Sequence, residues 1–316
     1  ELTRRDAHLL SAKAYGPAPA MRAACRASGI DGAIPVTYLD APPSRVGLQL
    51  WGATGRVSCP EGAKRVEGST QGPGRLWTGP GFRVLQLSGI RGDDGDARHQ
   101  AESMFTCVSA LLHANGFEWR HTVRTWIYLA RLLDWYGEFN QVRTAHFKNV
   151  GISGVTGFPA STGIQGRSGL GEECQMDLLA VDGLPIRFIR QTLRQKEAFS
   201  YGSAFSRGVV IERAGHRTIH VSGTASIDAS GRTIHVDDPA AQAEETVRNV
   251  AAVLDGEGAG LKHIVSATLF CRDADVLSAC LEALRARQLL TFPCVPVVAH
   301  VCRQDLLIEL EAVAAL

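Results

Sequence analysis

Two carboxylates lie near the end of the chain in a segment that is otherwise apolar. The alternation in Leu307-Ile-Glu-Leu-Glu-Ala-Val313 predicts a strand with Glu309 and Glu311 on one face and Ile308 and Leu310 on the other. In a poorly solvated pocket a carboxyl keeps its proton near neutral pH, because desolvation raises its pKa, and it can act as a general acid. Two solvated carboxylates at a sheet edge are the alternative, and the residues alone leave both open.

Arginines are the candidates for binding a carboxylated ligand. Arg124 shares one face of a predicted strand with Trp126 and Tyr128. An arginine on a mostly apolar strand is costly to bury unpaired, which favours either a bound carboxylate or a salt bridge to a neighbouring acid. Three other arginines are weaker candidates, because arginines on helices and loops are usually solvated: Arg143, Arg207 and Arg303.

Four further residues are candidates for the lining of such a site. Tyr201 could orient a ligand through its hydroxyl, and Thr224 and Ala225 follow the end of a predicted strand, where they could form a pocket wall. Ordinary loop and turn chemistry explains these three equally well. Cys302 lies seven positions before Glu309, although core packing alone accounts for most lone cysteines.

The remaining chemistry-bearing residues predict neither a metal nor a cofactor. The eight cysteines contain no CxxC pair, and the ten histidines contain no HExxH motif, so we expect neither a metal site nor a disulfide framework. The glycine-rich loop Gly163–Gly171 lacks the Lys-Ser/Thr ending of a phosphate-binding loop and the spacing of a dinucleotide fingerprint. It is typical of a turn or of the rim of a site.

The charge and hydropathy of the chain argue against two classes of partner, nucleic acids and membranes. Lys and Arg total 33 against 32 Asp and Glu, a net charge of +1, which gives no footprint for nucleic acid or an anionic membrane. No apolar run approaches the roughly 20 residues of a membrane helix, and the first residues lack the apolar core of a signal peptide. We therefore expect a cytoplasmic protein whose partners are small molecules or other proteins.

An internal repeat organises the chain. Residues Gln100–Val123 align without a gap onto Gln242–Val265, and both copies show apolar residues at helical spacing that end at a glycine. An alternating strand follows in each copy, at His121–Leu129 and His263–Cys271. The flanks repeat as well, and one of these pairings sets Asp177 opposite Glu309.

The repeat predicts an α+β fold of two tandem units. Each unit reads as strand, strand, helix, strand, helix, strand, with second helices at Trp135–Lys148 and Asp275–Arg287, so we expect a mixed β-sheet packed on two helices. The predicted division is an N-terminal extension at 1–70, a first unit at 71–195 and a second unit at 196–316 that carries the Glu309 strand. The extension contains a strand-like segment, Val46–Trp51.

The second unit resembles the RidA (YjgF) family of enamine/imine deaminases through Val221–Ile227, Gln242–Asn249 and Leu307–Ala314. The resemblance implies a chorismate mutase-like fold and, in that family, trimers in which an arginine after a late proline grips a carboxylated substrate. The corresponding stretch, Phe292-Pro-Cys-Val-Pro-Val297, contains no arginine. The deaminase clamp is therefore missing.

The two-unit arrangement is similar to the chorismatase family. The similarity is carried by seven segments: Arg124–Leu129, Tyr136–Arg143, Pro159–Gly163, Tyr201-Gly, Phe205–Arg207, Ser222–Ile227 and Cys302–Glu311. It implies cofactor-independent cleavage of chorismate into pyruvate and a hydroxybenzoate, with Glu309 as the acid and Arg124 as a carboxylate anchor. Two segments depart from the family pattern, Arg194-Gln-Lys-Glu197 and Asp228-Ala229.

Cys302 bears on the product. In the family, a cysteine at this position accompanies enzymes that form 3-hydroxybenzoate for secondary metabolism through an epoxide-like intermediate, which a thiol or thiolate could help to open. The resemblance therefore implies 3-hydroxybenzoate.

Two other functions remain open. One is a diverged RidA-like deaminase or tautomerase acting on another small unsaturated acid, and the other is a non-catalytic ligand-binding protein with the same fold. We expect a monomer, because two units in one chain can form the pocket shared by the halves, with a trimer as the alternative.

Overall fold

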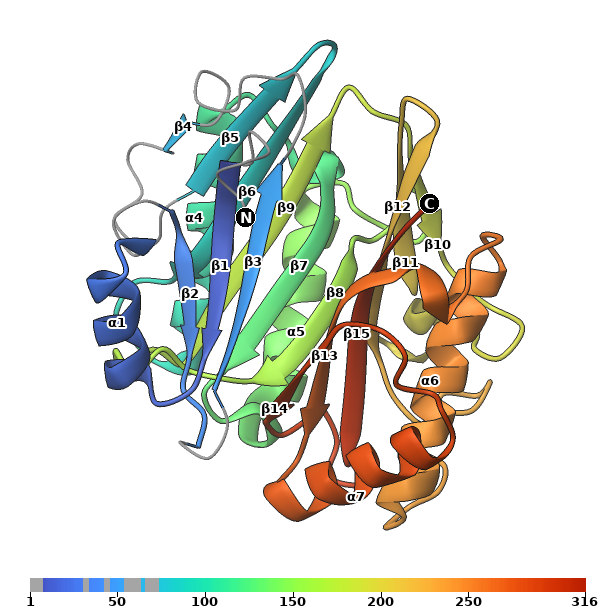
Figure 1. Ribbon diagram of the computed structural model, residues 1–316. Helices are drawn as coiled ribbons and strands as arrows, with labels where there is room; N and C mark the ends of the chain where they lie inside the picture. Colours follow the sequence, from blue (N-terminus) through green and yellow to red (C-terminus); the bar gives the residue numbers. More distant parts are fainter. Residues whose placement is uncertain (1–7, 31–33, 43–45, 54–63, 66–73) are drawn as a thin grey trace. The chain divides into compact units, whose positions relative to one another are not determined.

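The computed structural model of the protein describes residues 8–30, 34–42, 46–53, 64–65 and 74–316 (Figure 1). The chain forms two compact units, Glu1–Ala130 with Gly166–Leu184 and Arg131–Gln165 with Pro185–Leu316. The second unit thus includes a helix and a strand that belong to the first sequence repeat. The boundaries at residues 70 and 195 stay a prediction about the repeats.

An antiparallel sheet and helix α4 (Ala97–Ala114) form the body of the first unit. The strands of the sheet that belong to this unit have the order β4-β5-β6-β9-β7, and they are β4 (Lys64–Arg65), β5 (Gly74–Gly79), β6 (Phe82–Arg91), β9 (Cys174–Asp182) and β7 (Thr122–Leu129). Asp96 caps α4 by accepting a hydrogen bond from the His99 amide at 2.8 Å. The α4 side chains Met104, Phe105 and Val108 are buried, so the apolar face of the helix is covered.

A second, three-stranded sheet in the first unit comes from the N-terminal extension. It has the order β2-β1-β3, with β1 (His8–Tyr15) parallel to β2 (Val36–Leu39) and antiparallel to β3 (Gly47–Ala53). Helix α1 (Ala18–Ala27) packs on its core of Ala12, Ala14 and Tyr38. Figure 1 shows this sheet in front of the body sheet, with α4 behind. The predicted strand at 46–51 is confirmed as β3.

The second unit is built on a six-stranded sheet of order β10-β11-β12-β15-β13-β14. Its strands are β10 (Ile186–Ile189), β11 (Gly208–Arg213), β12 (His216–Thr224), β15 (Ile308–Ala315), β13 (Ile264–Cys271) and β14 (Cys294–Val298). Within this sheet, β13 and β14 are the only described strands that pair in parallel, and the other pairings are antiparallel. Helices α6 (Pro239–Asp255) and α7 (Ala274–Ala286) pack on one face.

Two further elements complete the second unit, α5 (Leu132–Asn149) and β8 (Ala160–Gln165). Strand β8 is fixed to β12, because the Ser161 amide donates to Ser222 Oγ at 3.0 Å. The second helices predicted for both repeats are confirmed as α5 and α7. Strands β8 and β14 were not predicted.

Candidate functional site

Glu309 and Glu311 lie on β15, the strand between β12 and β13 in the second unit. The alternate residues Ile308 and Leu310 join the apolar core beneath α6 and α7, so the two carboxylates point to the opposite face of the sheet. Glu309 and Glu311 are each only 5% exposed. The alternative of two solvated edge carboxylates is therefore wrong.

The carboxylate of Glu309 rests against the backbone of Gly223, near the end of β12. A methyl group built on the Gly223 Cα would lie 1.8 Å from Glu309 Oε1, so any side chain at this position would collide with the carboxylate. The β12–β15 ladder is irregular here, because its register shifts between Val221 and Thr224. The bulge and the glycine together make the space that Glu309 occupies.

Tyr136 and Arg143 come from helix α5 of the same unit. They are seven residues apart, two turns of helix, and so lie on one face. Arg143 is only 2% exposed, and its Nε and Nη2 atoms find no hydrogen-bond partner among the described residues. The expectation that Arg143 is solvated was wrong, because this face of the helix is turned inward. A buried guanidinium with unused donors is suited to a carboxylate ligand.

The charges of Glu309 and Arg143 both act on the hydroxyl of Tyr136. Burial raises the pKa of Tyr136, and the charges of Cys302 and Glu309 raise it further, whereas Arg143 lowers it. The hydroxyl also faces Gly163 of β8, since a methyl group built there would lie 3.3 Å from Tyr136 Oη. Tyr136 therefore remains a neutral hydrogen-bonding group beside the acid.

Cys302 shares this environment. Burial raises the pKa of the Cys302 thiol to about 12, and the Glu309 charge contributes in the same direction, while Arg303 and Arg143 oppose it. At neutral pH the side chain is a thiol, not a thiolate. Any role of Cys302 is thus that of a neutral, polarisable group.

The counterpart of Glu309 in the first unit, Asp177, is fully buried and already bound. Its Oδ1 accepts hydrogen bonds from Thr37 Oγ1 at 2.6 Å and from the Gly89 amide at 2.7 Å. Lys13 Nζ lies 3.9 Å from Oδ2 and 3.8 Å from the centroid of the Trp126 ring. Lys13 and Thr37 belong to β1 and β2, so the N-terminal extension supplies an ammonium group and a hydroxyl donor to this carboxylate.

Arg124 lies on β7 in the first unit. It is 2% exposed, and its guanidinium carbon is 4.9 Å from the centroid of the Trp126 ring. Burial beside this aromatic ring agrees with the predicted surroundings. Carboxylate binding by Arg124 stays a prediction.

Thr224 and Ala225 begin the loop that leaves β12, and both are buried. The Thr224 hydroxyl donates to the Ser222 carbonyl at 2.9 Å, and the Ala225 carbonyl accepts from Asn249 Nδ2 at 3.0 Å. Arg303 Nη1 donates to the Gly231 carbonyl at 2.7 Å, later in the same loop. These contacts hold the loop in place. The side chain of Tyr201 lies outside the described part of the chain.

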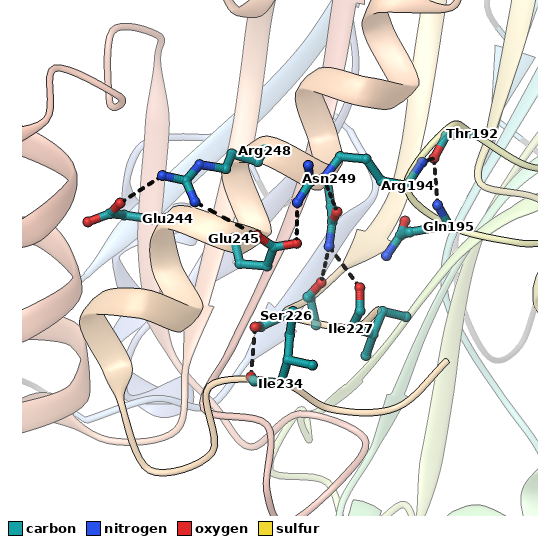
Figure 2. Close-up of polar contacts among 11 residues, drawn as sticks. Thr192, Arg194, Gln195, Ser226, Ile227, Ile234, Glu244, Glu245, Arg248 and Asn249 are labelled. Atoms are coloured by element: carbon teal, nitrogen blue, oxygen red, sulfur yellow. Dashed lines mark hydrogen bonds and ion pairs between the residues drawn. The ribbon is translucent and has the colours of Figure 1, made fainter. Parts of the chain in front are cut away.

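The connector that departs from the family pattern is tied to this loop. Arg194 Nη2 donates to Glu245 Oε1 at 2.6 Å, and its Nε donates to Asn249 Oδ1 at 3.0 Å. Asn249 in turn donates to the carbonyl of Ala225 at 3.0 Å. It also donates to the carbonyl of Ile227 at 3.2 Å, a contact drawn in Figure 2. Arg194 is therefore linked to the predicted pocket wall through one asparagine.

Asp228, the other departure, organises the turn of the same loop. Its Oδ1 accepts from the hydroxyl and amide of Ser230 at 2.6 and 2.8 Å and from the Arg232 amide at 3.0 Å. Hydrogen bonding, above all from the Ser230 hydroxyl, holds the pKa of Asp228 well below its usual range. Asp228 stabilises the turn as a carboxylate.

Arg207, the remaining arginine candidate, holds the connector. It is 1% exposed, and its Nε and Nη2 donate to the Lys196 carbonyl at 3.1 and 2.7 Å.

The described residues contain no group of three or more His, Cys, Asp or Glu side chains arranged to hold a metal ion. Nor does any helix in the described ranges combine the length and apolarity needed to cross a membrane.

Reasoning from the sequence missed Tyr136 and Gly223 as site residues. The signal for Tyr136 was its two-turn spacing from Arg143 on an amphipathic helix. The signal for Gly223 was a glycine close to the end of a predicted strand, next to the strand that carries Glu309. Neither signal is specific without the packing partner.

The chain was compared with known proteins. Residues 196–316 match the family model described as Endoribonuclease L-PSP. No curated protein matches the chain in sequence. A crystal structure of chorismatase matches with a TM-score of 0.75 and 20% identity, covering 99% of this chain and 95% of that chain.

Single-unit structures also match. A putative endoribonuclease L-PSP from Entamoeba histolytica has a TM-score of 0.35 and 17% identity, covering 42% of this chain and 100% of that chain. The YjgF gene product of E. coli has a TM-score of 0.29 and 28% identity, covering 35% of this chain and 86% of that one. The chorismatase match carries the conclusion: the predicted α+β fold of two tandem RidA-like units is confirmed, and the chain has the fold of chorismatase.

Proposed function

We propose that the protein cleaves the enol-pyruvyl ether of chorismate and that the second unit carries the reaction. The observation behind the proposal is that the second unit buries both a carboxyl, Glu309, and a guanidinium with unused donors, Arg143. Both act on the hydroxyl of Tyr136. The fold shared with chorismatase supports chorismate as the substrate.

The reaction begins with protonation of the vinyl carbon. Glu309 donates its proton to the methylene carbon of the enol-pyruvyl group, and the resulting cation is stabilised by the ether oxygen. Two routes then release pyruvate. In the first, water adds to the cationic carbon and the resulting hemiketal collapses to pyruvate and the ring alcohol. In the second, the oxygen of the neighbouring ring hydroxyl attacks the ring carbon that bears the ether, the bond from that carbon to the ether oxygen breaks so that its electron pair completes the ketone of pyruvate, the hydroxyl proton passes to the Glu309 carboxylate, and an epoxide remains on the ring. Glu309 leaves the protonation step as a carboxylate, and in the first route it regains a proton from water.

Two side chains of the second unit hold the substrate in this scheme. Arg143 binds one substrate carboxylate through Nε and Nη2, the edge of the guanidinium that can form two parallel hydrogen bonds. The Tyr136 hydroxyl donates to the substrate beside the acid, and it does so as a neutral group because its pKa is raised.

The proposed product is 3-hydroxybenzoate. In the second route, the epoxide opens at the carbon that carried the hydroxyl, and loss of one ring proton gives the aromatic ring. Pyruvate and 3-hydroxybenzoate together contain the atoms of chorismate, so no water is consumed overall. The Cys302 thiol assists the opening of the epoxide-like intermediate as a neutral group. The 3-hydroxybenzoate would then be incorporated into a secondary metabolite.

Purified protein incubated with chorismate tests the proposal. Pyruvate is followed with lactate dehydrogenase, and the aromatic product is identified by chromatography. Glu309→Gln should lower kcat by at least about 10²-fold, the usual contribution of a general acid. Glu282→Gln, at an exposed position on α7, is the matched control and should be unchanged. A folded wild-type protein that releases no pyruvate would refute the reaction.

The alternative of a diverged RidA-like deaminase or tautomerase rests on the family model matched by residues 196–316. A panel of small unsaturated carboxylic acids and 2-aminoacrylate-type enamines separates it from the main proposal, since only the latter requires chorismate. A non-catalytic ligand-binding protein would bind chorismate or a hydroxybenzoate without turnover, and Glu309→Gln would leave its affinity intact.

A further inference from the structure

Glu311, the second carboxylate of β15, has both oxygens engaged. Oε2 accepts a hydrogen bond from Thr162 Oγ1 at 2.6 Å, and Oε1 accepts one from Thr268 Oγ1 at 3.1 Å. Thr162 is 1% exposed and Thr268 is fully buried. A buried carboxylate that receives hydroxyl donors on both oxygens is held in one orientation.

Thr162 of β8 connects Glu311 to the backbone of β12. Its single hydroxyl proton is used toward Glu311, and its oxygen accepts the Gly223 amide at 3.1 Å. A second hydrogen bond joins β8 to β12 beside this one, because the amide of the preceding residue, Ser161, donates to Ser222 Oγ at 3.0 Å. The peptide of Gly223 is therefore fixed by a side chain from another strand, at the point where the β12–β15 ladder is irregular.

This fixed peptide is the surface against which the Glu309 carboxylate lies. A displacement of Gly223 by a few tenths of an ångström would change the room available to Glu309 Oε1. The chain of contacts thus runs from Glu311 through Thr162 to Gly223 and ends at Glu309.

We infer that Glu311 and Thr162 are positioning residues that hold the Gly223 bulge and thereby set the orientation of the Glu309 carboxyl. The inference rests on the proposed function for its catalytic consequence, although the positioning itself is a property of the fold. Misplacement of a reacting group by about 1 Å can cost about 10²-fold in rate. Loss of this support should therefore reduce turnover more than binding.

The test compares Thr162→Val with Thr162→Ser. Valine keeps the shape of threonine and removes the hydroxyl, whereas serine keeps the hydroxyl. With chorismate, we expect the valine variant to lose at least about tenfold in kcat with KM changed less than about threefold, and the serine variant to stay near wild type. Glu311→Met, which keeps the length of the side chain and removes both acceptor oxygens, should reproduce the valine result and serves if that variant folds poorly.

A readout independent of activity is the ¹³C chemical shift of the Glu309 carboxyl, recorded across a pH titration. This chemical shift should differ from the wild-type value in Thr162→Val and equal the wild-type value in Thr162→Ser. If the wild type cleaves no chorismate but the resonance still moves only in the valine variant, the proposed function fails and the positioning role stands. The inference is overturned if the folded valine variant keeps wild-type kcat and resonance, or if serine is as impaired as valine.

Discussion

Lys13 Nζ lies 3.9 Å from Asp177 Oδ2, and both side chains are almost entirely buried. Asp177 is the repeat counterpart of Glu309, so the two copies of the fold treat the same carboxylate differently. In the first unit the N-terminal extension supplies an ammonium and the Thr37 hydroxyl. In the second unit Glu309 lies beside Tyr136 and Cys302, and we propose that it serves as the acid.

We expect Lys13→Met to destabilise the protein by about 3 kcal/mol, because it leaves Asp177 buried without its ammonium partner. The pair Lys13→Met and Asp177→Asn together should cost less than the sum of the single changes. Urea denaturation measures all three variants, with Lys148→Met at an exposed site of α5 as the control. Strict additivity of the two changes would show that the pair does not interact.

Arg143→Met should weaken ligand binding and leave stability unchanged or raised. Replacing a buried guanidinium that has unused donors with an apolar side chain of similar length can stabilise by about 1–2 kcal/mol. The same change should cost about tenfold to a hundredfold in the Kd of 3-hydroxybenzoate, the value of a charged hydrogen bond. Calorimetry and thermal unfolding measure the two effects.

Arg285→Met, at an exposed position on α7, is the matched control and should alter neither quantity. A marked loss of stability in Arg143→Met with unchanged affinity would assign the guanidinium a structural role.

Cys302 should resist alkylation in the folded protein. With a pKa of about 12, its thiolate is about a thousandfold scarcer at pH 8 than that of an ordinary cysteine. Iodoacetamide labelling followed by peptide mass spectrometry measures the rate, and urea-unfolded protein provides the reference. Labelling of folded Cys302 at the unfolded rate would contradict the raised pKa of its thiol.

His146 on α5 should make the fold sensitive to acid. Burial lowers its pKa to about 4, so between about pH 6.5 and pH 4 the unfolded chain binds a proton that the folded chain does not. Stability contributed by the neutral imidazole is therefore complete above pH 6.5 and is lost as the pH falls. The drop in unfolding free energy from pH 7.5 to 5 should be about 1–2 kcal/mol larger in wild type than in His146→Gln. Equal drops would contradict this.

The long periodic elements were predictable from the sequence. Helix α6 has apolar residues at helical spacing, and strands β13 and β15 have side chains that alternate between two faces, so local periodicity alone indicates each element. Strands β8 and β14 were not. The first, Ala160-Ser-Thr-Gly-Ile-Gln165, is small and polar, and the second contains Pro296, so their extended conformation comes from pairing and not from propensity.

Prediction of the site was limited in the same way. Strand alternation predicted that Glu309 faces away from Ile308 and Leu310, but it left the burial of Glu309 open, because it does not say what covers that face of the sheet. Arg143 was misjudged because its spacing fits a helix but does not say which face is covered. The role of Gly223 depends on the close approach of Glu309, which lies 86 positions later in the chain. The ion pair of Asp177 depends on Lys13, which lies outside the repeat. Neither contact can be predicted from local sequence.

The central claim, that Glu309 protonates the vinyl carbon of chorismate, is tested most directly by running the reaction in D₂O and examining the pyruvate by NMR at short times. The account predicts that wild type and Glu282→Gln release pyruvate with one deuterium in its methyl group, and that Glu309→Gln releases pyruvate at least about 10²-fold more slowly. Pyruvate without deuterium from the wild type, or wild-type rates from Glu309→Gln, would contradict it.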